Sequence, residues 1–418
     1  MQPSKNLKEL SVFGFGGKQF PKWLLENSLW NMTSLVLKGC GSCQRLPPLG
    51  LLPFLKVLKI GKLDGIVNID ADFHGNNSSS FKSLEILVFS NMIQWEKWDC
   101  QAVMGAFPRL QELSITNCPK LKGQLPEQLV PLEVLEIQDC QQLEVFAPKA
   151  LNFELGNYGK LQWDWGTMKG LRMDTHNMEA SLQEIVGSNT LESLEIYSYS
   201  MSDDCVSLWT FPLDLFPTLR TLDLSGFGNL QMISQCCIHN YLEELTLQDC
   251  PKFESLSRSM HMLLPSLRSL SIQDCPRLES FPDRGLPSNL ETLIISKCSK
   301  LVSSLKRAFG DSPSLKRLEI DEVDAEFFPN EGFLPLSLTS LTISHCPNLK
   351  KMDYVHKLSS LENLDLINCF NLQCLPKEGL PKSISYLYIS GCPLLELRCQ
   401  KEGGEDWEKI AHIKTLYV

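Results

Sequence analysis

The chain has 418 residues, of which 43% are hydrophobic and 21% are charged, as in an ordinary folded protein. Its 39 basic and 49 acidic residues give a net charge of −10, which argues against a nucleic-acid-binding protein and against a polybasic membrane anchor. No apolar run reaches the roughly 18 residues of a membrane span, and the first six residues lack the apolar core of a secretion signal.

One unit, Leu-x-x-Leu-x-Ile-x-x-Cys, recurs along the chain, most clearly over 110–118, 132–140 and 267–275. Seventeen copies can be assigned, and their first, fourth and sixth positions are apolar throughout. Their average spacing of about 24 residues lies within the range of leucine-rich repeats. The first positions of the copies are Leu7, Met32, Leu55, Leu84, Leu110, Leu132, Ala150, Met168, Leu191, Leu219, Leu242, Leu267, Leu290, Leu315, Leu338, Leu361 and Ile384.

The spacing of the apolar positions predicts the fold. One residue, usually polar, separates the fourth and sixth positions, and this period of two places both side chains on one face of a short strand. A single coil cannot bury that face, whereas stacked coils bury it together. We therefore predict an α/β leucine-rich-repeat solenoid (a horseshoe) of about 17 coils over residues 1–392. Short parallel strands are expected on its concave face, with loops, turns and little helix on its convex face.

The segments that follow the predicted strands contain many prolines, as in Pro119-Lys-Leu121 and Leu125-Pro126. Proline breaks helices and favours turns, so the convex face is expected to hold turns and loops. The longest interval follows the unit at Leu55 and contains the polar run 70–80. We expect this run to bulge from its coil as a mobile loop.

Residues 393–418 depart from the repeat and are predicted to form a C-terminal capping segment. Two glycines at 403–404 precede acidic residues, and Trp407, Ile410 and Ile413 then recur at a spacing of three. This pattern predicts a short amphipathic helix over the last coil. The first unit at Leu7 has no comparable cap, so we expect the chain to begin inside a longer repeat array.

Cysteines follow the repeat. Nine of the 16 occupy the ninth position, where a small buried side chain suits the turn and a thiol can contact a carbonyl group of the next coil. We expect buried, reduced thiols rather than a disulfide framework, because the predicted compartment is reducing. The vicinal pair Cys236-Cys237 lies between units and has no obvious role. The nine are Cys40, Cys118, Cys140, Cys250, Cys275, Cys298, Cys346, Cys369 and Cys392.

Other motifs indicate no catalytic, metal or nucleotide chemistry. Cys40 and Cys43 form a single C-x-x-C without a second ligand pair, which is too little for a zinc site. The run 70–75 imitates the start of a calcium loop, but Phe81 occupies the twelfth position, where a glutamate is needed. The sequence contains no phosphate-binding loop, nucleophile elbow or zinc-protease helix. We therefore predict a chain that is not an enzyme and needs no cofactor or metal.

Three features of the sequence occur together. Cys-Pro-x-Leu follows several strands, Leu46-Pro-Pro-Leu49-Gly50 lies early in the chain, and 403–413 reads Gly-Gly-Glu-Asp-Trp-Glu-Lys-Ile-Ala-His-Ile. With these features the chain resembles the C-terminal leucine-rich-repeat region of plant coiled-coil NB-LRR intracellular disease-resistance proteins. One departure is Lys414, where the family usually has proline.

The resemblance implies a cytoplasmic, protein-binding function. In that family this region recognises a pathogen effector or a modified host protein, and it also packs against the receptor's own nucleotide-binding domain to hold that domain inactive. The expected partners are therefore a protein ligand and the nucleotide-binding domain, without nucleic acid and without a membrane span. The coiled coil and the nucleotide-binding switch of the family are not among these 418 residues.

Two alternatives have a different function. The first is the substrate-recognition part of an F-box ubiquitin-ligase adaptor, whose repeats also contain cysteine but have a helical back. The second is a generic leucine-rich-repeat scaffold without an immune role. The proline-rich back of this chain argues against the F-box class, and the upstream coding sequence would distinguish the three.

The candidate contact residues are the outward residues of the predicted strands. The early units carry apolar outward residues, which suggests a covered surface and an intramolecular contact with the nucleotide-binding domain. The later units carry charged and tyrosine residues, which are expected to contact the protein ligand. The proposed intramolecular contacts are Val36, Val57, Ile86 and Val88. The proposed ligand contacts are Arg172, Glu195, Asp223, Glu244, Arg317, Glu319, Asp365, Tyr386 and Tyr388.

Overall fold

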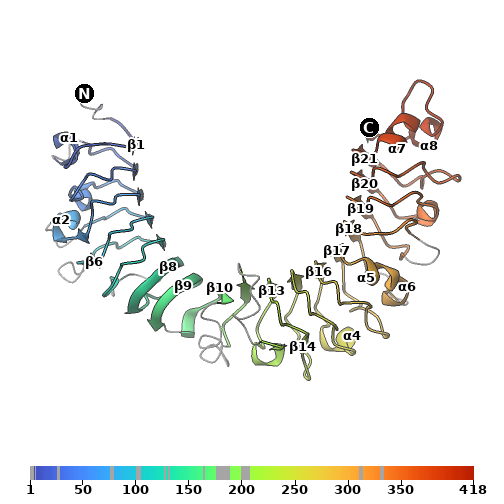
Figure 1. Ribbon diagram of the computed structural model, residues 1–418, viewed down its shortest axis with the longest axis horizontal. Helices are drawn as coiled ribbons and strands as arrows, with labels where there is room; N and C mark the ends of the chain where they lie inside the picture. Colours follow the sequence, from blue (N-terminus) through green and yellow to red (C-terminus); the bar gives the residue numbers. More distant parts are fainter. Residues whose placement is uncertain are drawn as a thin grey trace. The chain divides into compact units, whose positions relative to one another are not determined.

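The computed structural model describes the chain except for residues 1–3, 5, 26–28, 76–79, 100–104, 127–128, 130–131, 163–164, 176–188, 199–207, 310–313 and 330–333. The chain divides into two compact units, 1–193 and 194–418. Within each unit, short parallel strands stack one coil after another (Figure 1). Among the described residues, no helix is long and apolar enough to cross a membrane.

The first unit contains a parallel sheet in which each strand pairs with the strand of the next coil. Its register is regular, since Leu35 lies opposite Leu58 and Leu58 lies opposite Leu87. A separate two-stranded parallel sheet pairs β4 with β6. The elements are β1 (Glu9–Phe13), α1 (Lys22–Leu25), β2 (Ser34–Lys38), η1 (Leu49–Leu51), β3 (Val57–Gly61), β4 (Asn68–Ile69), α2 (Ala71–His74), β5 (Ile86–Ser90), β6 (Lys97–Trp98), β7 (Glu112–Thr116), β8 (Leu132–Phe146), β9 (Ala150–Gln162), η2 (Trp165–Thr167) and β10 (Gly170–Asp174).

The second unit repeats this arrangement, with Leu222 opposite Leu245 and Leu245 opposite Leu270. Its separate two-stranded sheet pairs β12 with β14. The elements are β11 (Ser193–Tyr197), β12 (Thr210–Pro212), η4 (Leu213–Leu215), β13 (Thr221–Ser225), β14 (Met232–Ser234), β15 (Glu244–Gln248), α4 (Met260–Leu263), β16 (Ser269–Gln273), β17 (Thr292–Ser296), α5 (Ser299–Ser303), α6 (Leu305–Ala308), β18 (Arg317–Asp321), β19 (Ser340–Ser344), η5 (Val355–Lys357), β20 (Asn363–Ile367), β21 (Tyr386–Ser390), α7 (Pro393–Arg398), α8 (Trp407–Ile410) and β22 (Thr415–Tyr417).

Alternating side chains explain these strands. In β13, Leu222 and Leu224 are buried, whereas Thr221, Asp223 and Ser225 point away from the core and are half-buried. A strand begins two residues after each predicted first position, except that β8 and β9 begin at the first position itself. The longest described helix, α7, has six residues. The predicted fold class, a parallel-strand leucine-rich-repeat solenoid with little helix, is confirmed.

The eighth position of most units adopts a left-handed backbone, as at Asn117 (φ 51°) and Asp249 (φ 51°). Asparagine, aspartate and glycine tolerate this conformation better than other residues. The N–H of Asn117 donates to the carbonyl oxygen of Gln138 at 2.9 Å, and that of Asp249 donates to Gln273 at 3.0 Å. The turn therefore joins neighbouring coils and directs the ninth side chain into the core.

The cysteines at the ninth position are all buried, as the repeat predicts. The Sγ atom of Cys250 lies 3.3 Å from the carbonyl oxygen of Gln248 and 3.7 Å from that of Leu224. Leu224 belongs to the preceding coil, so the expected contact with the next coil is wrong.

The polar run 70–80 was expected to bulge from its coil as a loop, but its first half is packed into the core. Residues Ala71–His74 form α2, and Phe73 and His74 are fully buried. The rings of Phe73 and Phe81 lie 5.0 Å apart, and Phe81 stacks on Phe107 at 4.9 Å. Burial lowers the pKa of His74 to about 4, so this ring is neutral. The expectation fails because aromatic side chains anchor the run in the core; residues 76–79 lie outside the described part.

The C-terminal segment holds α7, α8 and β22. In and after α8, Ile410 is fully buried and Ile413 is 7% exposed, in agreement with the predicted apolar spacing. Leu416 of β22 lies opposite Leu387 of β21, so the sheet continues past the last assigned repeat. This strand was not predicted, because three residues carry no repeat period. The boundary at residue 392 stays a prediction.

Candidate protein-recognition surface

The third and fifth positions of the repeat are the first and third residues of a five-residue strand. Their side chains point away from the core, as Thr221 and Asp223 do in β13. Because the strands are parallel and in register, each position forms a column of side chains across the sheet. These two columns form the strand face of each unit, which is the surface on which all the predicted contact residues lie.

The strand face of the first unit holds the four predicted apolar residues, all of them half-buried. Val57 and Ile86 are direct neighbours in the third-position column. Val36 and Val88 are not neighbours, because Lys59 lies between them in the fifth-position column and is exposed. The structure therefore brings together the pair Val57 and Ile86, whereas Lys59 separates Val36 from Val88.

Farther along the same unit, the fifth-position column carries charge. Glu136 lies opposite Glu154, and Glu154 lies opposite Arg172. Nη1 of Arg172 is 3.8 Å from a carboxylate oxygen of Glu154, and Ser114 donates its hydroxyl to Glu136 at 2.6 Å. The predicted contact Arg172 is therefore a counterion of a neighbouring glutamate. Exposed pairs of this kind contribute roughly 0–1 kcal/mol and exchange partners at little cost.

In the second unit, Glu195, Asp223 and Glu244 lie on the strand face as predicted. Asp223 accepts a hydrogen bond from the Ser225 hydroxyl at 2.8 Å. Glu244 is exposed and occupies the third-position column, whereas Glu195 and Asp223 occupy the fifth. These acids therefore lie in two columns.

At the end of the second unit, four predicted or related residues come together. Asp365 lies opposite Tyr388, and Tyr388 lies opposite Tyr417 of β22. The Tyr417 ring is 6.0 Å from the Tyr386 ring and 6.2 Å from the Tyr388 ring. Sequence reasoning missed Tyr417 because it missed β22. Asp365, Tyr386, Tyr388 and Tyr417 are called the terminal aromatic cluster.

Burial and charge affect the ionisation of this cluster. Partial burial raises the pKa of Asp365, although the Thr342 hydroxyl, at 3.3 Å, opposes the shift. Desolvation, with the nearby carboxylate of Asp365, raises the pKa of Tyr386. Arg317 and Glu319 lie on β18, and Glu319 is opposite Thr342, so they are near the cluster but not part of it.

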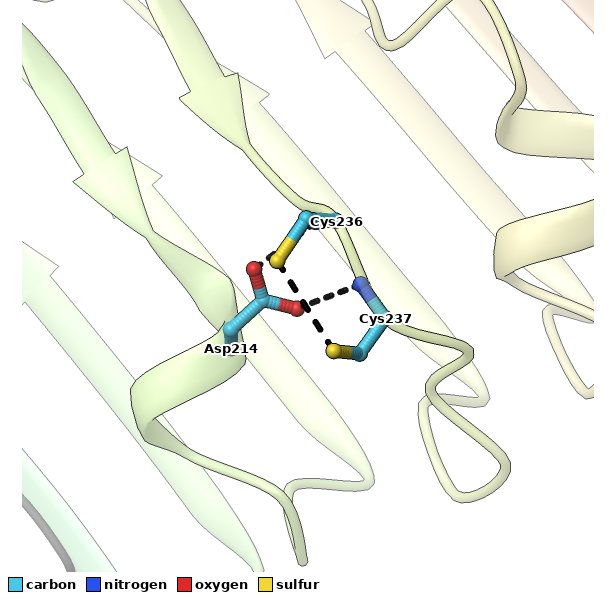
Figure 2. A group of neighbouring side chains, drawn as sticks. All are labelled: Asp214, Cys236 and Cys237. Atoms are coloured by element: carbon cyan, nitrogen blue, oxygen red, sulfur yellow. Dashed lines mark hydrogen bonds between the residues drawn. The ribbon is translucent and has the colours of Figure 1, made fainter.

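Away from the strand face, Asp214, Cys236 and Cys237 lie together (Figure 2). Among the described residues, this is the one group of three side chains placed closely enough to share a metal ion. The carboxylate of Asp214 and the neighbouring Cys237 raise the pKa of the Cys236 thiol to about 11. Burial alone would raise the pKa of Asp214, but hydrogen bonds from both cysteines lower it. Sequence reasoning assigned no role to this pair.

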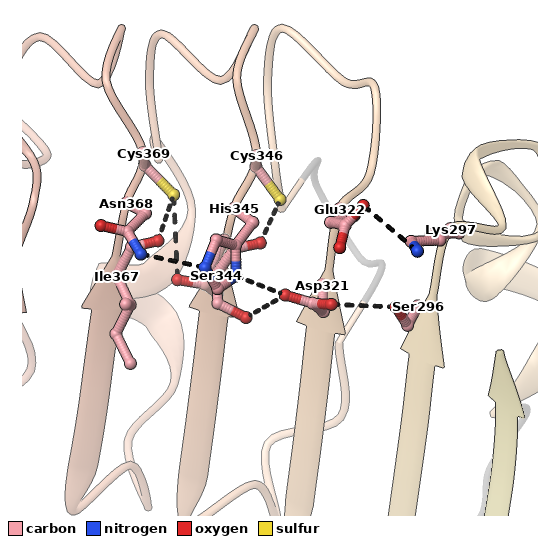
Figure 3. Close-up of polar contacts among 11 residues, drawn as sticks. Ser296, Lys297, Asp321, Glu322, Ser344, His345, Cys346, Ile367, Asn368 and Cys369 are labelled. Atoms are coloured by element: carbon pink, nitrogen blue, oxygen red, sulfur yellow. Dashed lines mark hydrogen bonds and ion pairs between the residues drawn. The ribbon is translucent and has the colours of Figure 1, made fainter. Parts of the chain in front are cut away.

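A second missed feature is a polar network at the ends of β17 to β20 (Figure 3). One oxygen of Asp321 accepts the Ser344 hydroxyl at 2.6 Å and Nδ1 of His345 at 2.9 Å, and the other accepts the Ser296 hydroxyl at 2.9 Å. Asn368 Nδ2 can only donate, so Nε2 of His345, 2.9 Å away, accepts and Nδ1 carries the proton. Burial would raise the pKa of Asp321, but these donors hold it below the ordinary range.

The comparisons with known proteins agree with this fold. Residues 1–63 match the family model described as R13L1/DRL21 LRRs. Over 145 residues, 34% of this chain, it is 39% identical to the putative disease resistance protein At3g14460 of Arabidopsis thaliana. Over 64% of this chain it is 28% identical to the putative disease resistance RPP13-like protein 1 of the same plant. The matches span only 10% and 24% of the lengths of those two relatives.

Similar solved structures are also leucine-rich-repeat proteins. The circular protein CroV588 matches 87% of this chain and 57% of its own chain, with 16% identity and a TM-score of 0.46. The repeat domain of the type III effector XopL matches 68% of this chain and 77% of its own, with 21% identity and a TM-score of 0.31.

The fold and the repeat define a leucine-rich-repeat protein, a class whose fold serves as a scaffold for protein interaction. Within that class, the chain resembles the leucine-rich-repeat region of plant disease-resistance proteins of the NB-LRR type, as the sequence motifs predict. That prediction is confirmed.

Proposed function

We propose that this chain is the protein-recognition region of an intracellular plant immune receptor that detects a pathogen effector or a modified host protein. In this proposal it acts in the cytoplasm by binding protein ligands, without catalysis and without a cofactor. The observation that carries the proposal is the terminal aromatic cluster on the strand face. Its tyrosines are half-buried or exposed, and tyrosine is a residue type that often anchors protein interfaces.

The ligand surface in this proposal lies on the strand face of each unit. Charged residues steer a partner and exclude others, whereas the tyrosines supply most of the binding energy. The proposed contacts are Arg172 in the first unit and Glu195, Asp223, Glu244, Arg317, Glu319, Asp365, Tyr386 and Tyr388 in the second, to which Tyr417 is now added.

The autoinhibitory contact in this proposal lies on the first unit. Val57 and Ile86 form a half-buried apolar pair on neighbouring strands, with Val36 and Val88 on either side of Lys59. An apolar pair on a strand face favours a covering surface, and the receptor's own nucleotide-binding domain is the proposed cover. The family resemblance supports this assignment.

The alternative functions are an F-box adaptor and a scaffold without an immune role. The short described helices and the similarity to disease-resistance proteins favour the receptor.

The upstream coding sequence is a direct test, because a nucleotide-binding domain there supports the proposal and an F-box contradicts it. Co-expression of the full receptor with individual pathogen effectors in leaves, scored by cell death, then tests detection itself. A receptor that responds to no effector and to no modified host protein would contradict the proposed function.

A further inference from the structure

Asp214, Cys236 and Cys237 come from two different coils of the second unit. Asp214 lies in η4, directly after β12, and the two cysteines follow β14. Because β12 and β14 pair in parallel, with Phe211 opposite Ile233, their following turns lie side by side. The pairing therefore places a carboxylate beside a vicinal dithiol (Figure 2).

The three side chains are held at short distances. The carboxylate oxygens of Asp214 accept the N–H of Cys236 at 2.8 Å and the N–H of Cys237 at 3.1 Å. The two Sγ atoms are 3.7 Å apart, and a carboxylate oxygen and both sulfur atoms all lie within 4.8 Å of one another. Both cysteines are exposed, so an ion could reach the group from solvent.

The turn that carries the cysteines is fixed on both sides. Before them, the Gln235 side chain donates to the carbonyl oxygens of Cys237 at 3.1 Å and Leu263 at 3.0 Å. After them, His239 is buried; its Nδ1 accepts the N–H of Leu242, so its Nε2 donates to the carbonyl oxygen of Phe216. His239 uses both ring nitrogens and is not a candidate ligand. The cluster is therefore preorganised rather than carried on a free loop.

The spacing of the sulfur atoms suits one metal ion. Two zinc–sulfur bonds of about 2.3 Å at a tetrahedral angle place the sulfur atoms about 3.8 Å apart. A disulfide fits less well, because adjacent Cα atoms lie about 3.8 Å apart, whereas disulfides usually join Cα atoms about 4.4–6.8 Å apart. We propose that Asp214, Cys236 and Cys237 bind one thiophilic divalent cation of the zinc class, with water as the fourth ligand. Each thiol releases its proton to solvent when it coordinates.

The test uses the full 418-residue chain, fully reduced. Zinc is titrated in competition with a chromophoric chelator, and cadmium is titrated while the ultraviolet absorption of cadmium–thiolate bonds is followed. The variants are Cys236→Ser, Cys237→Ser and Asp214→Asn, and the matched control is Cys374→Ser, a partly exposed cysteine outside the cluster. Circular dichroism shows whether each variant keeps its fold.

The proposal predicts one zinc ion per chain and a cadmium–thiolate band. Each cysteine variant should weaken binding by more than about tenfold and reduce the band, and Asp214→Asn should weaken binding without removing the band. Cys374→Ser should bind as the parent chain does. Unchanged stoichiometry and affinity in the Cys236→Ser, Cys237→Ser double variant would overturn the proposal, as would the absence of zinc binding by the parent chain.

Discussion

The buried carboxylate of Asp406 accepts a hydrogen bond from Nε of Arg398 at 3.0 Å. The same oxygen accepts the N–H of Leu375, in the preceding coil, at 3.1 Å, and Nζ of Lys409 lies 2.8 Å from the other oxygen. One side chain therefore joins α7, α8 and the back of the last repeats. The sequence marks the acidic residues of the C-terminal segment only as part of a helix start, but one of them, Asp406, makes these contacts.

Substitution of Asp406 should destabilise the second unit. Asp406→Ala leaves the buried N–H of Leu375 without an acceptor and removes the partner of the partly exposed Arg398 and Lys409, so we expect a loss of about 2 kcal/mol in the free energy of unfolding. Urea unfolding followed by circular dichroism measures it. The control is Glu405→Gln, because Glu405 contacts Arg398 at an exposed position and should cost less than about 1 kcal/mol. Equal effects of the two substitutions would contradict this role for Asp406.

The same carboxylate should make the second unit sensitive to acid. Burial would raise the pKa of Asp406, but Arg398, Lys409 and the N–H of Leu375 outweigh it and lower the pKa. Its stabilisation is thus present above the unfolded pKa of about 3.9 and is lost as the pH falls through the folded value. The stability difference between the parent chain and Asp406→Asn should stay constant from neutral pH to about pH 5, and shrink below about pH 4. A difference that shrinks near neutral pH would show that another group dominates.

The thiols offer a test of the repeat assignment. We expect all 16 to be reduced in the native protein, since the described ninth-position cysteines point into the core. Alkylation under denaturing, non-reducing conditions should label every cysteine in the mass spectrum, including Cys100 and Cys205, which lie outside the described residues. A reproducible mass with two cysteines unlabelled would contradict this expectation.

The repeat predicted the strands well because each inward position is set by a local period of two. Leu222 and Leu224 are buried for that reason alone. The expectation for the run 70–80 fails because its aromatic rings contact later coils. The Phe73 ring lies 6.3 Å from the Phe89 ring, and the His74 ring lies 5.5 Å from the Phe107 ring. No local period encodes such contacts. The repeat also could not predict which side chains are neighbours on the strand face. Lys59 lies between Val36 and Val88 because of the register of three strands, and the sequence period does not give that register.

The proposed autoinhibitory contact can be tested in the full receptor. Aspartate at both Val57 and Ile86 would place two charges on the apolar pair and weaken a covering domain. Cell death without any ligand should therefore increase. Ser34→Asp is the control, because Ser34 lies beside Val57 in the same column and is already polar. If the Val57 and Ile86 variant accumulates normally and shows no activity without ligand, the assignment of this pair is wrong.

The most direct test of the recognition surface is the Tyr386→Ala, Tyr388→Ala variant of the full receptor, with Glu319→Lys as a second variant and Phe370→Ala as the control. Phe370 is an exposed aromatic residue in the turn after β20, outside the strand face. Loss of two anchor side chains should weaken ligand binding by about 30-fold or more. The account predicts that recognition is lost in the first two variants at unchanged protein level and kept in the control. Intact recognition in the strand-face variants, together with loss on substitution of the turns behind the sheet, would contradict it.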